Sequence, residues 1–184
     1  KKGRSNHLLD PLTSIPIIGT NIRKKKLILI KQMEGKVKLK VYRVRENAKL
    51  PVRAHRTDAG MDLFFCPEDK KGTTLFSQHT KLFQTGLKFE VPEGYMLEIK
   101  NKSSVASKRQ LVVGACVVDS GYDGEVFVNL HNIGFASQYL EPGQKIAQAV
   151  LIPVSYCEVD EVVSDNLNEG STRGDGALGS TGDR

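Results

Sequence analysis

The sequence predicts an all-β fold, and three observations support that prediction. Short apolar or alternating runs recur along the chain and are separated by turn signals rich in Gly and Pro. Seventeen glycines outnumber the seven Phe and five Tyr residues combined, which is typical of a protein with many turns and few large core residues. No segment shows a helical period of apolar residues sustained between caps. Several short strands with regular turns indicate a sandwich, a jelly roll or a barrel.

The N-terminal part of the chain differs in charge from the rest. Residues 1–50 hold fourteen Lys or Arg against three Asp or Glu, whereas residues 51–184 hold thirteen against eighteen. The net charge of +6 therefore does not indicate that the folded body binds nucleic acid. We expect residues 1–32 to be a disordered basic leader or extension. The alternative is a functional basic arm for nucleic acid or an anionic membrane.

Individual elements follow from the local pattern. We expect the folded domain to span residues 33–163, because regular alternation begins at Lys36–Val41 and predicts a first half-buried strand there. Pro92-Glu93-Gly94 and Pro142-Gly143 predict turns. Ser103–Lys108 is the candidate for a short helix. Five later strands are predicted over residues 82–89, 95–99, 111–118, 126–130 and 147–154.

The three cysteines do not indicate a cross-linked or zinc-bound protein. Cys66, Cys116 and Cys157 are odd in number, widely spaced and not arranged as C-x-x-C. A reducing, cytoplasmic environment fits this usage best. Residues 164–184 are rich in Gly, Ser, Thr, Asn and Asp, and they carry too little apolar surface to order themselves.

That C-terminal stretch nevertheless contains the most specific segment, Arg173–Gly182. Glycines at this density expose backbone N–H groups that can form an anion-binding nest. Arg173 supplies a planar donor fork suited to phosphate, and Ser180 and Thr181 add hydroxyl groups. The segment lacks the Gly-Lys-Ser/Thr of a P-loop. A flexible tail without a ligand is the alternative.

Four further segments have weaker chemical content when taken singly. Asn101–Ala106 combines a cation, hydroxyls and helix-start amides, which suit phosphate or simply a cap. Gly143–Gln148 is a turn entering a strand. Asp62 lies next to a strand and could help to hold hydrated Mg²⁺. In Gly114–Gly124, an apolar strand ends on Asp119, which could orient a water as general base, and Tyr122 follows three residues later.

Together, in this order and spacing, the five segments resemble the motifs of the trimeric deoxyuridine triphosphatase (dUTPase) family over roughly residues 37–184. The resemblance implies a jelly roll of the β-clip type with a flexible Gly-rich C-terminal arm. It also implies a homotrimer in which three subunits share each active site. The activity implied is hydrolysis of dUTP to dUMP and pyrophosphate with Mg²⁺ as cofactor. We expect no stable nucleic-acid or membrane partner.

The resemblance also implies roles for single residues. Asp119 would contact the deoxyribose 3′-hydroxyl and activate the attacking water. Tyr122 would pack on the deoxyribose and leave no space for a 2′-hydroxyl. A hairpin would read uracil through its backbone groups. The uracil-reading hairpin comprises Gly114, Ala115 and Cys116.

The triphosphate would be held from three segments. Arg173 would close the arm over the terminal phosphate, and Asp62 would lie in the outer shell of Mg²⁺, contacting it through water. The remaining expected substrate contacts are Lys102, Ser103, Ser104, Gln148, Leu178, Gly179 and Ser180.

Three residues depart from the family pattern. Lys102 stands where Arg is usual, so a bidentate contact becomes a point charge. Asp123 stands where Arg is frequent, and Leu178 where a Phe stacks on uracil. The related dCTP deaminases place a catalytic Glu at the position of Asn129, so deamination is a poor alternative. A regulatory nucleotide-binding trimer without turnover is a second alternative, which Asp119 argues against.

Overall fold

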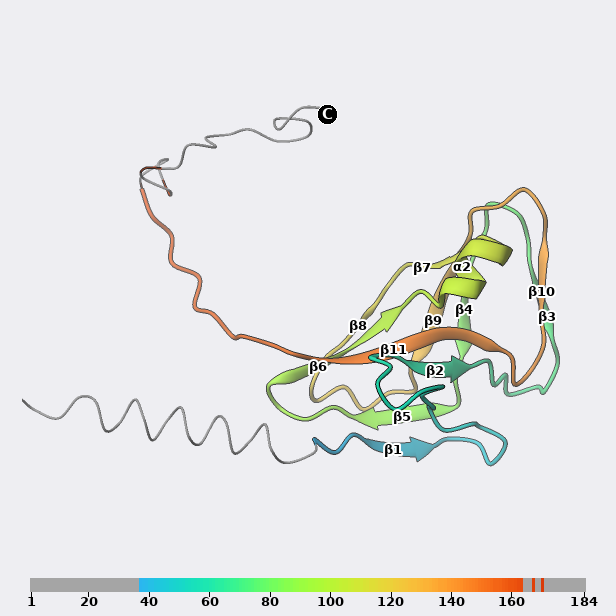
Figure 1. The fold of residues 1–184 in the computed structure, drawn as a ribbon, viewed down its shortest axis with the longest axis horizontal. Coiled ribbons are helices and arrows are strands. Elements are labelled where there is room, and N and C mark those ends of the chain that lie inside the picture. Colours follow the sequence, from blue (N-terminus) through green and yellow to red (C-terminus); the bar gives the residue numbers. More distant parts are fainter. Residues whose placement is uncertain (1–36, 164–166, 168–169, 171–184) are drawn as a thin grey trace, which may run out of the picture. The chain divides into compact units, whose positions relative to one another are not determined.

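The computed structural model describes residues 37–163, Leu167 and Gly170 (Figure 1). Expectations about the leader and about Arg173, Leu178, Gly179 and Ser180 lie outside these residues. The chain divides into one compact unit that ends at Pro153 and a second that begins at Val154. The described residues from Val154 onward contain neither helix nor strand.

The first unit is nearly all β, as the sequence predicts. One helix lies among its described residues, α2 (Ser103–Arg109), at the predicted place. The strands are β1 (Lys40–Arg43), β2 (Met61–Phe64), β3 (Thr73–Leu75), β4 (Thr80–Gln84), β5 (Leu87–Glu90), β6 (Tyr95–Lys100), β7 (Leu111–Val113), β8 (Val117–Val118), β9 (Phe127–Asn132), β10 (Gln138–Leu140) and β11 (Lys145–Pro153).

The strands pair antiparallel and out of sequence order. One sheet has the order β2-β11-β6-β8 and another β4-β9-β7, while β1 pairs with β5 and β10 with β3. The last strand, β11, therefore lies between β2 and β6 (Figure 1). This wide separation of paired strands in the sequence agrees with the expected jelly roll.

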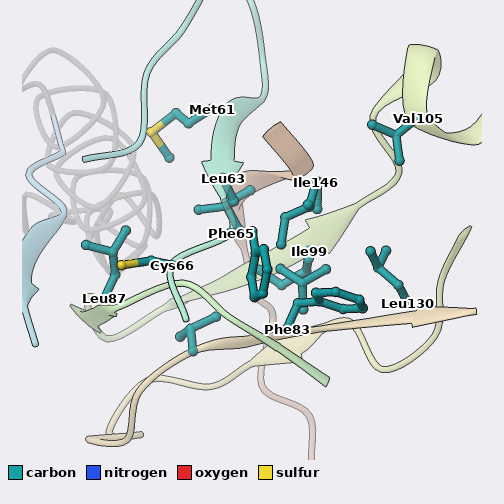
Figure 2. Close-up of a cluster of buried hydrophobic side chains, with 14 of the residues drawn as sticks. Met61, Leu63, Phe65, Cys66, Phe83, Leu87, Ile99, Val105, Leu130 and Ile146 are labelled. Atoms are coloured by element: carbon teal, nitrogen blue, oxygen red, sulfur yellow. The ribbon is translucent and has the colours of Figure 1, made fainter. Parts of the chain in front are cut away.

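The core forms where the inner faces of the two larger sheets meet. Along β9 buried and more exposed residues alternate, with Val128, Leu130 and Asn132 on the buried side. Figure 2 shows Leu63, Phe65 and Phe83 pointing toward one another among these strands. The rings of Phe65 and Phe83 lie 5.1 Å apart in an edge-to-face arrangement, which is favourable for aromatic pairs.

Two predicted strands are wrong as continuous elements. Residues 82–89 divide into β4 and β5, because Gly86 adopts a φ of 70° and the Thr85 hydroxyl donates to the carbonyl of Val126 at 2.6 Å. Residues 111–118 divide into β7 and β8, which belong to different sheets. The predicted turns at 92–94 and 142–143 are confirmed, with Gly94 and Gly143 at positive φ.

Within the described part of the chain, we find no helix with the length and apolar character needed to cross a membrane.

Candidate functional site

The segment expected to form the uracil-reading hairpin is a loop between β7 and β8. The prediction of a hairpin is wrong, because β7 pairs with β9 and β8 pairs with β6. Gly114 shapes this loop. The Gly114 N–H donates to the carbonyl of Asn129 at 3.0 Å, and a Cβ on this residue would overlap the side chains of Asn129 and His131. Glycine is therefore required for this close approach to β9. The Cys116 carbonyl accepts from the N–H of Ile99 at 2.7 Å. Among the described residues, the backbone groups of Ala115 in this loop have no partner.

Asp119 and Tyr122 line the same hollow as Ala115 and Cys116 of this loop. The hollow has a volume of about 220 Å³. Asp119 follows β8 and is exposed, and its carbonyl accepts from the Tyr122 N–H at 3.3 Å, which closes a turn. The Tyr122 side chain is 48% exposed, so its ring is available to a ligand. The structure thus brings together the proposed base, the tyrosine, Ala115 and Cys116, and it places Gly114 at the start of the β7–β8 loop, outside the hollow.

Two of the expected phosphate residues, Lys102 and Gln148, gather with Asp62 at a second place. Asp62 on β2 lies beside Gln148 on β11, because the two residues are cross-strand partners. A hollow of about 290 Å³ is lined by Asp62, Lys102, Gln148 and Gly60. A Cβ on Gly60 would overlap the Gln148 side chain, so the strands approach closely here. The sugar-side and phosphate-side residues therefore line different hollows of one chain.

Asp62 is the electrostatic centre of this second cluster. Its carboxylate is buried, with Oδ1 2.9 Å from Lys102 Nζ and Oδ2 2.6 Å from Lys145 Nζ. Burial acts to raise the pKa of Asp62, but the two ammonium groups outweigh it and hold the pKa below its usual value. Asp62 therefore stays ionised and fixes the position of two cations.

Lys145 was not among the expected site residues, and the structure shows how it reaches Asp62. The register between β11 and β2 shifts between Lys145 and Ala147. Such a bulge re-aims a side chain, and here it turns the ammonium of Lys145 toward the carboxylate. A turn followed by a strand gives no sequence signal for such a bulge.

Asn101 opens the Asn101–Ala106 segment but was not itself among the expected site residues. Its carbonyl accepts from Gln148 Nε2 at 2.9 Å, and its Oδ1 accepts from the N–H of Val113 at 2.6 Å. Asn101 thus links Gln148 on β11 to β7, the strand that precedes the loop with Ala115. Only its position next to Lys102 could have indicated it.

The first turn of α2 presents the two expected serines. Ser103 and Ser104 are exposed, and the N-cap residue Lys102 makes no side-chain capping bond. The Lys102 carbonyl accepts from the N–H groups of Val105 and Ala106, so the serine N–H groups, which precede these, have no intrahelical partner. Hydroxyls, amides and an ammonium at one point can bind an anion.

The departure at Asp123 is explained locally. The carboxylate lies 3.6 Å from Lys88 Nζ on β5, and its side chain is 95% exposed. An exposed pair of this kind contributes little to stability. Asp123 is therefore tolerated beside Tyr122 without reaching the hollow.

The Asp62 cluster predicts a pH-dependent stability difference between the wild type and Asp62→Asn. Because the folded pKa lies below the unfolded one, the carboxylate stabilises the fold fully above about pH 3.9, the ordinary Asp pKa. This contribution is lost as the pH falls through the folded pKa. We expect Asp62→Asn to lower the free energy of unfolding by about 1–3 kcal/mol at neutral pH, since two lysines lose their counterion. Urea unfolding at fixed protein concentration measures it.

The difference in the free energy of unfolding between the wild type and Asp62→Asn should shrink in acid, when Asp62 of the wild type is itself protonated. Asp160→Asn, at an exposed position, is the control and should match the wild type at every pH. If this difference in the free energy of unfolding stays constant into acid, the charge of Asp62 is not its cause.

Comparison with known proteins gives one consistent family. A family model described as dUTPase matches residues 46–182. The deoxyuridine 5′-triphosphate nucleotidohydrolase of Clostridium novyi is 39% identical over 148 residues, covering 79% of this chain and 99% of that protein. The one from Clostridium tetani is 40% identical over 146 residues, covering 78% and 96%.

Solved structures agree. A variant dUTPase of Staphylococcus bacteriophage 80alpha with dUpNHpp has a TM-score of 0.71 and 28% identity, covering 79% of this chain and 98% of that one. A variant from phage phi11 of S. aureus, described as revealing the coordination of a structural Mg(II) ion, has a TM-score of 0.63 and 27% identity, covering 70% and 98%.

Proposed function

Because this chain belongs to the dUTPase family of hydrolases, we propose that it hydrolyses dUTP to dUMP and pyrophosphate by attack of a water that Asp119 activates. The supporting observation is that Asp119 and Tyr122 line one hollow together with Ala115 and Cys116. A carboxylate, an aromatic ring and backbone groups there suit a water, a sugar and a base respectively. The reaction would limit uracil incorporation into DNA and supply dUMP for dTMP synthesis.

Uracil recognition would fall mainly to Ala115. Since the Gly114 N–H and the Cys116 carbonyl are engaged within the chain, the N–H and C=O of Ala115 and the Cys116 N–H are the groups available to the base. A donor and an acceptor at fixed positions pair with the uracil edge. A cytosine amino group would meet a donor instead, and an unpaired polar group is costly.

The triphosphate would bind to Lys102, Ser103, Ser104 and Gln148. Asp62 holds Lys102 at the entrance of α2, so the ammonium is positioned before substrate arrives. Residues 164–184 would act as the C-terminal arm, with Arg173, Gly179 and Ser180 contacting the phosphates. Fixed charges of this kind stabilise phosphoryl transfer by positioning and electrostatics.

The chain offers Mg²⁺ an outer-shell contact. Within the described ranges, no three His, Cys, Asp or Glu side chains cluster as a metal site. Asp62 lines the same hollow as Lys102 and Gln148, where its carboxylate would accept from a water of a hydrated ion. Mg²⁺ commonly keeps several waters and binds substrate phosphates, which suits this set. When bound, it would neutralise charge on the triphosphate.

We propose that the active enzyme is a homotrimer with shared sites. The family resemblance implies this assembly. The separation of the two hollows supports it, because within one chain Asp119 and Tyr122 line one hollow, whereas Lys102 and Gln148 line another. Neighbouring subunits would then supply the two halves of each site.

A nucleotide panel with pyrophosphate detection tests the proposed function. We expect dUTP to be hydrolysed far faster than dCTP, dTTP or UTP. Release of ammonia from dCTP would support deamination instead. Binding of dUTP without any turnover would support a regulatory trimer.

Leu178 provides a further test of the arm. Leu178→Phe should lower the KM for dUTP, because stacking of an aromatic ring on a base is worth roughly 1–3 kcal/mol. Steady-state kinetics measure this, with Leu167→Phe as a control that lies in the arm but before the Arg173–Gly182 motif. An unchanged or higher KM would mean that the arm closes by another contact.

A further inference from the structure

The position of the Tyr122 ring is set by the backbone of its own turn. The Tyr122 hydroxyl donates to the carbonyl of Glu125 at 3.1 Å. The ring lies over Gly124, where a Cβ would overlap both Oη and Cζ of Tyr122. The same turn carries Asp119, whose carbonyl accepts from the Tyr122 N–H. Gly124, against which the ring packs, and Glu125, whose carbonyl accepts from its hydroxyl, therefore fix the tyrosine; these two residues are termed the tyrosine seat.

Glu125 is in turn held by a nearly buried ion pair. Its Oε1 accepts from the N–H of Gly86 at 2.8 Å and also pairs with Nη2 of Arg45. The side chains of Arg45 and Glu125 are only 16% and 13% exposed. A hydrogen-bonded pair of this kind fixes geometry, since either charge alone would be left without a partner.

The neighbouring backbone is tied to the same place. The Thr85 hydroxyl donates to the Val126 carbonyl, and the Val126 N–H donates to the Leu87 carbonyl at 2.9 Å. Arg45 enters from the loop after β1, so three separate chain segments meet at Glu125. The tyrosine seat is thus attached to the β4–β5 and β1 regions and does not depend on its own turn alone.

We propose that the Arg45–Glu125 ion pair, together with Gly124, positions Tyr122 and thereby sets how strictly the site discriminates deoxyribose from ribose. This inference rests on the proposed function, in which the Tyr122 ring excludes a 2′-hydroxyl. Arg45, Gly124 and Glu125 are positioning residues, because they act on the tyrosine and do not line its hollow. A ring free to shift by a fraction of an ångström leaves room for the extra hydroxyl.

The test compares the kcat/KM for dUTP with that for UTP in variants of the full-length protein. For Glu125→Gln and for Arg45→Met we expect this ratio to fall roughly tenfold, the size of effect that loss of a charged hydrogen bond produces. Gly124→Ala should lower it similarly, because it displaces the ring without touching the ion pair. A ratio of two substrates is independent of the fraction of folded enzyme.

Two further measurements separate positioning from stability. The double variant with both Glu125→Gln and Arg45→Met should have a thermal midpoint above those of the single variants. Its ratio of kcat/KM for dUTP to kcat/KM for UTP should stay low. Glu90→Gln is the matched control, because Glu90 pairs with Lys40 on the exposed surface, and it should keep the wild-type ratio.

The ratio of the dissociation constants of UMP and dUMP, measured by calorimetry, repeats the test without turnover. A wild type that fails to hydrolyse dUTP defeats the proposed function, whereas this binding ratio still tests the tyrosine seat. Folded variants at Arg45, Gly124 and Glu125 that discriminate as well as the wild type would overturn the inference.

Discussion

Asp119→Asn is expected to reduce the kcat for dUTP by about 10²–10⁴-fold, the usual cost of losing general-base assistance. The amide has nearly the shape of the carboxylate but cannot take a proton from water. Asp119 is exposed at the end of β8, so the substitution should leave the fold and the thermal midpoint unchanged. Dissociation constants for a non-hydrolysable dUTP analogue should stay close to the wild-type value.

Asp123→Asn is the matched control for this prediction. Asp123 is a carboxylate of the same turn, but its side chain is 95% exposed and faces Lys88. We expect its kcat to remain within about twofold of the wild type, as is usual for an exposed pair. If both variants keep normal turnover, Asp119 is not the base.

Mixed trimers of two inactive chains should regain activity if neighbouring subunits complete each site. One chain carries Asp119→Asn and the other Lys102→Ala, so each homotrimer lacks one group in every site. Random mixing gives about three-quarters mixed trimers, each with one intact site in three, so about a quarter of wild-type activity should return. Co-expression with two purification tags and pyrophosphate detection measures the gain over the separate homotrimers.

The control mixture combines Asp119→Asn with a chain that carries both substitutions. No site in it can regain Asp119, so no activity should return. If the first mixture also shows no gain, each site draws Asp119 and Lys102 from the same chain, and the shared-site proposal fails.

The sequence indicated the elements whose signals are local. Turns at Gly94 and Gly143 followed from Pro and Gly, and α2 lies where the candidate short helix, Ser103–Lys108, was predicted. The run at 111–118 was predicted as one apolar strand. Its division into β7 and β8 occurs at Gly114, where the side chains of Asn129 and His131 on β9 leave no room for a Cβ. Such a contact between distant residues leaves no periodic trace in either segment.

The same distinction applies to the site. From the sequence we predict which residues carry the chemistry, because Asp119, Tyr122 and Lys102 stand in segments whose order and spacing resemble one family. The counterions of two supporting carboxylates could be found only in the folded chain: Lys145 reaches Asp62 through a bulge, and Arg45 reaches Glu125 across 80 positions of the chain. The physical reason is that a buried charge must find its counterion through space, and chain folding, not sequence spacing, determines which one lies within reach.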